Sequence, residues 1–91
     1  MRPWTVRLSA SAVRGLDRLP PRVVPAVVEF LYGALADNPE RAGKPLRGTL
    51  DGLYGARRGD YRILHEIDGS SRVVLIHRTA GRADAYRSMS W

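Results

Sequence analysis

Apolar and polar residues alternate with a helical period in the first half of the chain and with a period of two in the second half. In the first half, an apolar stripe at i, i+3, i+4, i+7 and i+11 predicts an amphipathic helix. The stripe consists of Val24, Val27, Val28, Leu31 and Leu35. An earlier helix, capped by Ser9 or Ser11 and ending at Leu19, is expected to turn Val13 and Leu16 toward the core. Together the two segments predict a helical hairpin with one apolar face.

The period of two in the second half predicts strands, with turns rich in Gly, Asp and Ser between them. Including one near the start of the chain, strands are expected at 4–8, 53–58, 61–67 and 72–78. The last of these is apolar on both faces at 73–76, so we expect it to be central in the sheet. The segment 40–52 is rich in Gly and is predicted to be a loop.

These elements predict a small α+β fold in one domain, residues 1–91, because a chain of this length supports a single core. The expected order is β-α-α-β-β-β. An antiparallel sheet would pack against the helical hairpin, and a short C-terminal helical turn would follow at 82–89. The sheet face away from the hairpin would be partly open and lined by polar strand positions.

No segment predicts a membrane span or a targeting sequence. The longest purely apolar run of the strand-rich half, 73–76, is far shorter than the ~20 residues that a spanning helix needs. The first residues are interrupted by charge and lack an apolar signal core. Cysteine is absent as well, so we expect a cytoplasmic protein without disulfides or thiolate metal sites.

The charge of the chain is strongly positive and comes almost entirely from arginine. Fifteen Lys and Arg residues oppose nine Asp and Glu residues, for a net charge of +6, and every one of the fifteen except Lys44 is arginine. The guanidinium fork binds phosphate bidentately, and a sequence pI near 10.8 is typical of nucleic-acid binders. An acidic protein would satisfy the same charge. We therefore expect a partner that is nucleic acid, the ribosome or an acidic protein.

Motifs for several common chemistries are missing: the chain has no Walker loop, no Gly-x-Gly-x-x-Gly after a strand and no cysteine nucleophile. His65 and His77 lie on neighbouring predicted strands, where they could form an acid–base pair or help to hold a metal ion. Strand histidines are usually packed or hydrogen-bonded, however, and we predict no metal and no cofactor. Arginine and tyrosine remain as the residue types that could carry chemistry.

Arginine and tyrosine together suit the cleavage of RNA by its own ribose 2′-OH. Guanidinium groups can neutralise the charge that develops on the phosphate, and a tyrosine near cations can move the proton. The candidates are Arg57, Arg58 and Arg62 around one hairpin and Arg78, Arg82, Tyr86 and Arg87 near the end of the chain. Arg82 and Tyr86 are four residues apart, which places them on one side of a helix. Arginines on a sheet surface can equally be solvated, so residue types alone do not decide between a catalytic role and a solvated surface.

Three segments, in order along nearly the whole chain, resemble the sequence signature of the RelE/ParE toxin superfamily. They are Leu46-Arg47-Gly48 followed by Leu53-Tyr54, the stretch from Arg57-Arg58-Gly59-Asp60-Tyr61-Arg62 to Asp68, and Arg82-Ala83-Asp84-Ala85-Tyr86-Arg87. The segment Leu16-Asp17-Arg18-Leu19-Pro20 is similar to the first helix of the family. The resemblance implies a toxin of a type II toxin–antitoxin system with the fold expected above.

The resemblance also implies roles for individual residues. Arg62 and Arg82 would stabilise the scissile phosphate as catalytic residues, with Arg78 as the alternative counterpart of Arg82. Tyr86 would orient or deprotonate the 2′-OH. The residues expected to bind phosphate or RNA are Lys44, Arg47, Arg57, Arg58 and Arg78.

The chain departs from well-studied RelE members at two places. Those members carry lysines on the strand where Gly55, Ala56 and Arg57 stand here, and a histidine often occupies the position of Gly81. RelE members cleave mRNA in the ribosomal A site without metal, whereas ParE members poison DNA gyrase. The mRNA endonuclease is the favoured hypothesis and the gyrase poison is the alternative. A third hypothesis is a basic binding domain, or a decayed toxin kept as an antitoxin-bound complex on operator DNA.

The resemblance implies partners too: a cognate antitoxin, the ribosome and mRNA, and no membrane. We expect an acidic, extended antitoxin whose amphipathic helix covers the sheet or the helical hairpin. The toxin–antitoxin complex would bind operator DNA through the antitoxin.

Overall fold

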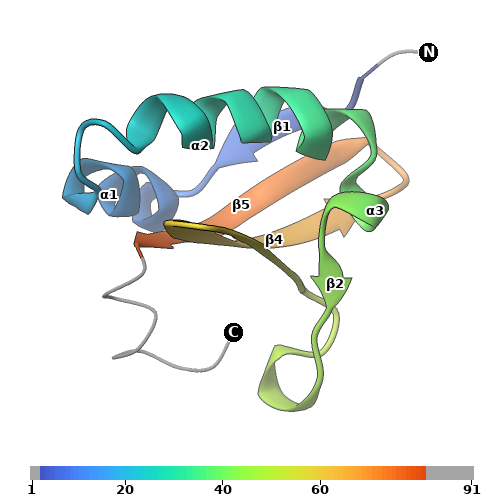
Figure 1. The fold of residues 1–91 in the computed structure, drawn as a ribbon. Coiled ribbons are helices and arrows are strands. Elements are labelled where there is room, and N and C mark those ends of the chain that lie inside the picture. The colour runs from blue at the N-terminus through green and yellow to red at the C-terminus, as the bar shows by residue number, and fades with distance from the viewer. Residues whose placement is uncertain (1–2, 82–91) are drawn as a thin grey trace.

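A five-stranded sheet with helices on one face makes up the part of the chain that the structure, a computed structural model, describes: residues 3–81 (Figure 1). The sheet order is β1-β5-β4-β3-β2. The strands are β1 Thr5–Leu8, β2 Lys44–Pro45, β3 Tyr54–Arg58, β4 Tyr61–Asp68 and β5 Val73–Gly81. The helices are α1 Ala10–Arg18, α2 Val24–Phe30 and α3 Pro39–Ala42, with a π-helical turn η1 Leu31–Leu35 that continues α2 and a 3-10 turn η2 Gly48–Leu50. The helical turn predicted at 82–89 lies outside the described residues.

Helix α1 packs directly on β5 because small residues face the strand. Ala12 is fully buried, and a Cβ on Gly15 would come within 2.1 Å of the Thr79 carbonyl oxygen. The Thr79 hydroxyl donates a hydrogen bond to the Ala12 carbonyl oxygen over 2.8 Å. Ser9 accepts a hydrogen bond from the Ala12 N–H, which confirms it as the N-cap, and its hydroxyl donates to the His77 carbonyl oxygen.

The expected core faces of the two helices are partly wrong. Val13 is 47 % exposed, because Ala12 and Gly15 form the buried side of α1, although Leu16 packs against the core as predicted. Val28 is 42 % exposed, so the buried stripe of the second helix is narrower than its sequence pattern. The stripe residues that are fully buried are Val27, Leu31 and Leu35.

The main core lies between the helices and the sheet. From the sheet, its fully buried side chains include Ile63, Val74 and Ile76. Burying each such side chain stabilises the fold by roughly 1.5–3 kcal/mol. Within residues 3–81, no helix combines the length and the apolar character needed to cross a membrane.

The sheet is mixed, which corrects the expectation of an antiparallel sheet. Strands β3, β4 and β5 form the predicted antiparallel meander, and β5 is central, between β1 and β4, as predicted. Strand β1, however, runs parallel to β5, with Thr5 opposite Val73 and Leu8 opposite Ile76. Periodicity shows which residues face the core but carries no information about strand direction.

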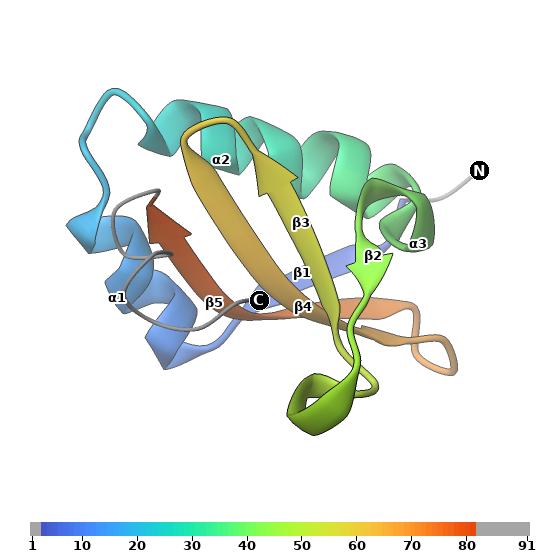
Figure 2. The same cartoon turned by 60° about the horizontal axis from the view of Figure 1, so that its bottom comes forward.

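The segment predicted as a loop, 40–52, contains three short elements instead. Asn38 caps α3 by accepting a hydrogen bond from the Arg41 N–H over 3.3 Å. Strand β2 pairs with β3 over two residues. The chain then turns beneath the sheet face opposite the helices, the open face (Figure 2), which carries Arg57, Arg62, Leu64, Arg78 and Ala80. A small second core forms there from Leu64 and Ala80 with Leu46, Leu50 and Leu53.

Candidate functional site

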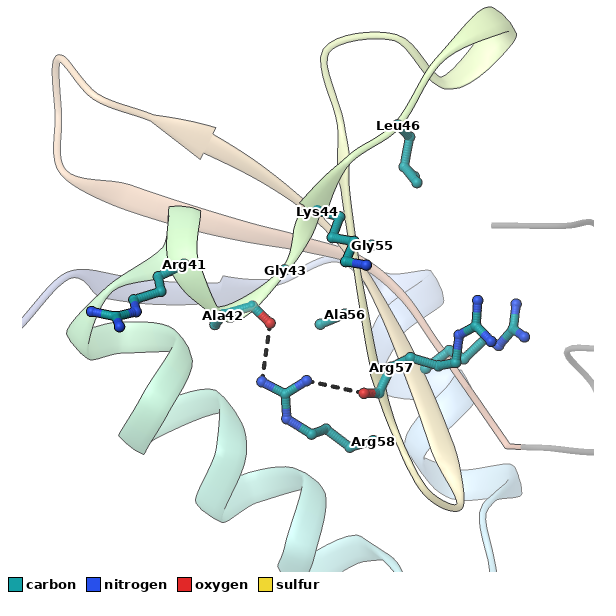
Figure 3. A pocket seen from close by; sticks show the side chains of 10 residues that line it. Arg41, Ala42, Gly43, Lys44, Leu46, Gly55, Ala56, Arg57 and Arg58 are labelled. Atoms are coloured by element: carbon teal, nitrogen blue, oxygen red, sulfur yellow. Dashed lines mark hydrogen bonds between the residues drawn. The ribbon is translucent and has the colours of Figure 1, made fainter.

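A pocket of about 550 Å³ opens beside β3, where α3 and β2 face that strand (Figure 3). Segments 41–44 and 55–58 form its two walls, and Leu46 and Arg62 complete the lining. All of the charged lining residues are cations: Arg41, Lys44, Arg57, Arg58 and Arg62. Because no acidic side chain is among the described residues that line the pocket, the pocket attracts anions.

An arginine from each of three neighbouring strands faces the open side of the sheet. Arg57 on β3 lies directly opposite Arg62 on β4. Arg78 on β5 lies opposite Leu64, two residues from the position that pairs with Arg62. Like charges placed directly opposite on neighbouring strands cost stability, roughly 0.2–1 kcal/mol per pair. A bound anion such as phosphate would offset this cost.

The positions at which RelE members carry lysines are filled differently in this chain. Gly55 faces the open side, but Leu46 packs over it, since a Cβ on Gly55 would lie 3.3 Å from Leu46 Cδ2. Ala56 is buried in the main core. Of these three residues, Arg57 alone brings a positive charge to the open face.

The guanidinium of Arg58 has three partners within the chain. It donates one hydrogen bond to the Ala42 carbonyl oxygen over 3.0 Å and one to the Arg57 carbonyl oxygen over 3.0 Å (Figure 3). Its central carbon lies 4.5 Å from the centroid of the Phe30 ring, a cation–π contact. The side chain therefore bridges the two walls of the pocket.

The other residues expected to bind phosphate lie around this pocket. Lys44 is exposed on β2, in the wall of the pocket, whereas Arg47 is exposed just before η2 and is not part of the lining. Arg41, at the pocket rim on α3, is a residue that the sequence analysis missed. The pair Asn38-Pro39 could have revealed it, because an N-cap residue followed by proline is typical of the start of a helix.

Arg82 and Tyr86 lie outside the described residues, so their catalytic roles remain predictions. Gly81, the last described residue, pairs with Tyr61, and Ala80 pairs with Arg62. The choice between Arg78 and Arg82 as the catalytic arginine also stays a prediction.

The two histidines are packed or hydrogen-bonded, as predicted, and do not form an acid–base pair. His65 is fully buried on the core side of β4, with Nε2 3.4 Å from the Pro39 carbonyl oxygen and Tyr54 stacked on its ring. Burial lowers the pKa of His65 to about 4, so the ring is neutral at pH 7. His77 contacts Glu66 at 2.9 Å. Among the described residues, no group of three or more metal-ligating side chains occurs.

Tyr61 directly precedes Arg62 in the sequence, but its contacts suit a structural role and not a catalytic one. Its ring packs against Phe30, and its hydroxyl donates a hydrogen bond to the Ala26 carbonyl oxygen over 3.4 Å. Burial raises the pKa of Tyr61, although the charge of Arg58 acts in the opposite direction. A raised pKa is unsuited to a base that must lose its proton near neutral pH.

Comparison with known proteins identifies the family. Residues 6–86 match the family described as ParE toxin of type II toxin-antitoxin system, parDE. The chain is 52 % identical over 85 residues to Toxin RelG of Mycobacterium tuberculosis (strain ATCC 25618 / H37Rv). The aligned residues cover 93 % of this chain and 98 % of RelG. The chain belongs to the RelE/ParE toxin family of type II toxin–antitoxin systems. The family predicted from the sequence is thereby confirmed.

Further relatives agree with the family and the fold. Toxin RelE of the same organism is 51 % identical over 86 residues, covering 93 % of this chain and 88 % of that toxin. A chain of the toxin-antitoxin complex RelBE2 from M. tuberculosis superimposes with a TM-score of 0.86 at 50 % identity, covering 88 % of this chain and 99 % of that chain. A chain of the RelE-RelB complex from Pyrococcus horikoshii OT3 gives 0.62 at 25 % identity, covering 88 % and 96 %. The predicted α+β class is confirmed.

Proposed function

We propose that this toxin is a metal-independent endoribonuclease that cleaves mRNA on the ribosome and so inhibits translation. The observation that carries the proposal is the Arg57–Arg62 pair, two cations directly opposite each other in a pocket whose lining contains no acid. RNA presents a regular row of phosphates, and the guanidinium group binds phosphate strongly and with defined geometry. The similarity to Toxin RelE and Toxin RelG supports the same class of activity.

In the proposed reaction, the ribose 2′-oxygen attacks the adjacent phosphorus while the bond to the 5′-oxygen breaks. The products are a 2′,3′-cyclic phosphate and a 5′-hydroxyl. The proton of the 2′-OH passes to a base, for which we propose the phenolate of Tyr86, and the leaving 5′-oxygen takes up a proton from water. Negative charge grows on the non-bridging oxygens in the transition state, so the protein must supply positive charge there.

Arg57 and Arg62 are suited to supply that charge from β3 and β4. Removing one such donor typically costs about 2.7–4 kcal/mol of transition-state stabilisation. Arg82 would add a further guanidinium, with Arg78 as the alternative. Lys44, Arg47 and Arg78 would add positive potential along the path of the RNA.

We propose that a cognate antitoxin neutralises this toxin in the cytoplasm and that the complex binds operator DNA through the antitoxin. The matched RelBE2 structure is of a toxin-antitoxin complex, and the matched Pyrococcus horikoshii structure is of a RelE-RelB complex. The cationic pocket favours an acidic antitoxin segment. Exposed apolar side chains on the helices, Val13, Val28 and Tyr32, offer contacts for an amphipathic helix.

Mapping of mRNA 5′ ends after induction of the toxin in growing cells tests the proposed function. New 5′ ends within coding regions should appear together with growth arrest. Growth arrest with intact transcripts would contradict the nuclease.

The alternative, a gyrase poison without nuclease activity, is favoured by the family description, which names parDE. A supercoiling assay beside a translation assay separates the two activities. Blocked supercoiling with normal translation would select the gyrase poison, and inhibited translation with normal supercoiling would select the nuclease.

A further inference from the structure

Arg58 lines the cationic pocket, yet its guanidinium is bound to the protein itself. Its partners come from three elements: Ala42 at the end of α3, Arg57 on β3 and Phe30 at the end of α2. We propose that Arg58 is a positioning residue, which holds the end of α3 against β3 and so sets the width of the pocket, and that it is not a phosphate ligand. This inference rests on the proposed function only in that it takes the pocket to be the RNA site.

The two walls of the pocket need such a bridge because strand pairing between them is short. Strand β2 pairs with β3 only through Lys44–Gly55 and Pro45–Tyr54. Toward Arg58, the outer edge of β3 faces the pocket instead of another strand. Arg58 takes the place of a strand neighbour there by donating to the Arg57 carbonyl oxygen.

The contact with Ala42 provides a hydrogen-bond donor for a backbone carbonyl at the end of α3. Ala42 is the last residue of α3, and the final carbonyls of a helix lack partners within that helix. Arg58 donates to the Ala42 carbonyl oxygen over 3.0 Å and so caps α3. A cation at this end of a helix is also favoured by the helix dipole, although a helix this short has a small one.

The contact with Phe30 fixes the plane of the guanidinium. The group lies 4.5 Å from the ring centroid, and Phe30 itself is buried against Tyr61 in the main core. A planar guanidinium stacked on a ring keeps the N–H groups at its edge free to donate, which suits two carbonyls on opposite sides. A lysine ammonium is a point charge on a flexible stem and cannot reproduce this bridge.

The junction that Arg58 holds is closely fitted on its other side. A Cβ on Gly43 would lie 2.9 Å from His65 Cε1 and 3.0 Å from the Gly55 carbonyl oxygen, so the chain between α3 and β2 rests on the sheet. Arg41 and Lys44 stand on either side of Ala42 and Gly43. Their distance from Arg57 across the pocket therefore depends on the bridge made by Arg58.

Binding of a non-cleavable RNA to substituted toxins tests this role. The probe is a short 2′-O-methyl RNA, measured by fluorescence anisotropy over a salt series at a temperature well below the melting of every variant. Arg58→Lys and Arg58→Gln should both weaken binding, by roughly tenfold and to the same extent, because misplacement and not lost charge is the cause. In the matched pair, Arg57→Lys should keep most of the affinity, while Arg57→Gln lowers the slope of log K against log salt by about 0.7.

Two results would overturn the positioning role. If Arg58→Lys binds RNA like the wild type, and if Arg58→Gln lowers the slope of log K against log salt by about 0.7, Arg58 binds phosphate. If both Arg58 variants melt earlier but bind RNA like the wild type, the bridge supports stability alone.

Hydrogen exchange separates a failure of this inference from a failure of the proposed function. The Ala42 N–H is bonded to the Asn38 carbonyl oxygen over 3.0 Å, and it should exchange faster in both Arg58 variants. If the wild type binds no RNA, the proposed function fails, and faster exchange would still support the bridge. Unchanged exchange of Ala42 would overturn the bridge itself.

Discussion

A second pocket among residues 3–81 is similar in volume to the cationic pocket but differs from it in charge. The pocket beside β3 measures about 550 Å³ and is lined by five cations and no acid. The second pocket measures about 490 Å³, and its charged and aromatic lining residues are Glu40, Asp51, Trp4 and Tyr54. Leu46 lines both pockets, so they are neighbours.

Charge, and not volume, therefore distinguishes the proposed RNA site from the second pocket. Of the twelve cations among the described residues 3–81, five line the first pocket and none lines the second. A phosphate in the second pocket would meet two carboxylates, whereas in the first it meets only positive charge. RNA should therefore enter the first pocket and avoid the second.

Arg62→Ala should give the largest effect on activity. Loss of a guanidinium that stabilises the transition state is expected to lower the cleavage rate by about 10²–10³-fold. Initial rates of mRNA cleavage on programmed ribosomes measure this effect. Asp51→Asn in the second pocket and Arg22→Ala, an exposed cation outside both pockets, are the controls and should cleave like the wild type. A loss at Asp51 as large as that at Arg62 would reverse the assignment of the two pockets.

The stability of the protein should depend on pH through His65, which lies between the two pockets. The His65 ring contacts Tyr54, which lines the second pocket, and leaves no room for a Cβ on Gly43, which lines the first. Its pKa is lowered from 6.5 to about 4, so the unfolded chain takes up a proton before the folded one as the pH falls. The contribution of neutral His65 to the free energy of unfolding should be complete above pH ~6.5. The free energy of unfolding should then fall by about 2–3 kcal/mol as the pH drops to ~4.

Urea unfolding between pH 4 and pH 8 measures this dependence. In His65→Phe the titrating group is gone, so the curve for the variant should be flatter than that of the wild type over this range. Parallel curves for the two proteins would show that His65 does not couple protonation to folding.

The effect of Arg57→Gln on RNA binding, as distinct from cleavage, should be the smallest of the three measured effects. The slope of log K against log salt for RNA binding should fall by about 0.7, the value for one lost phosphate contact on a single strand. The melting temperature should not fall, because the substitution also removes the like charge opposite Arg62. Glu40→Gln in the second pocket should leave the slope unchanged. An equal change of slope in both variants would mean that RNA does not distinguish the pockets.

The sequence predicted the elements with strong periodicity and the residues that those elements carry. The meander and its central strand followed from the period of two and from the apolar run at 73–76, and the pairing of Arg57 with Arg62 follows from that hairpin. Val13 is predicted in the core from its helical spacing, but Ala12 is buried in its place. Small residues form the buried side of α1 because the close approach of this helix to Thr79 leaves no room for a larger side chain.

Features that depend on long-range contacts could not be predicted. The parallel direction of β1 is set by the path of the chain through the helices, which no local pattern encodes. Segment 40–52 has too few residues per element to show a period, and only the pair Asn38-Pro39 indicates α3 and with it the pocket residue Arg41. The partners of Arg58 lie 16 residues away at Ala42 and on Phe30, and nothing at position 58 itself indicates them.

Backbone amide shifts during titration with a non-cleavable 2′-O-methyl RNA test the assignment of the phosphate site most directly. We expect the amides of 41–44 and 55–58 and of Arg62, which line the cationic pocket, to move with a common affinity. Those of 51–53, which lie at the second pocket, should stay in place. Shifts confined to 51–53, with the walls of the cationic pocket unchanged, would contradict the assignment.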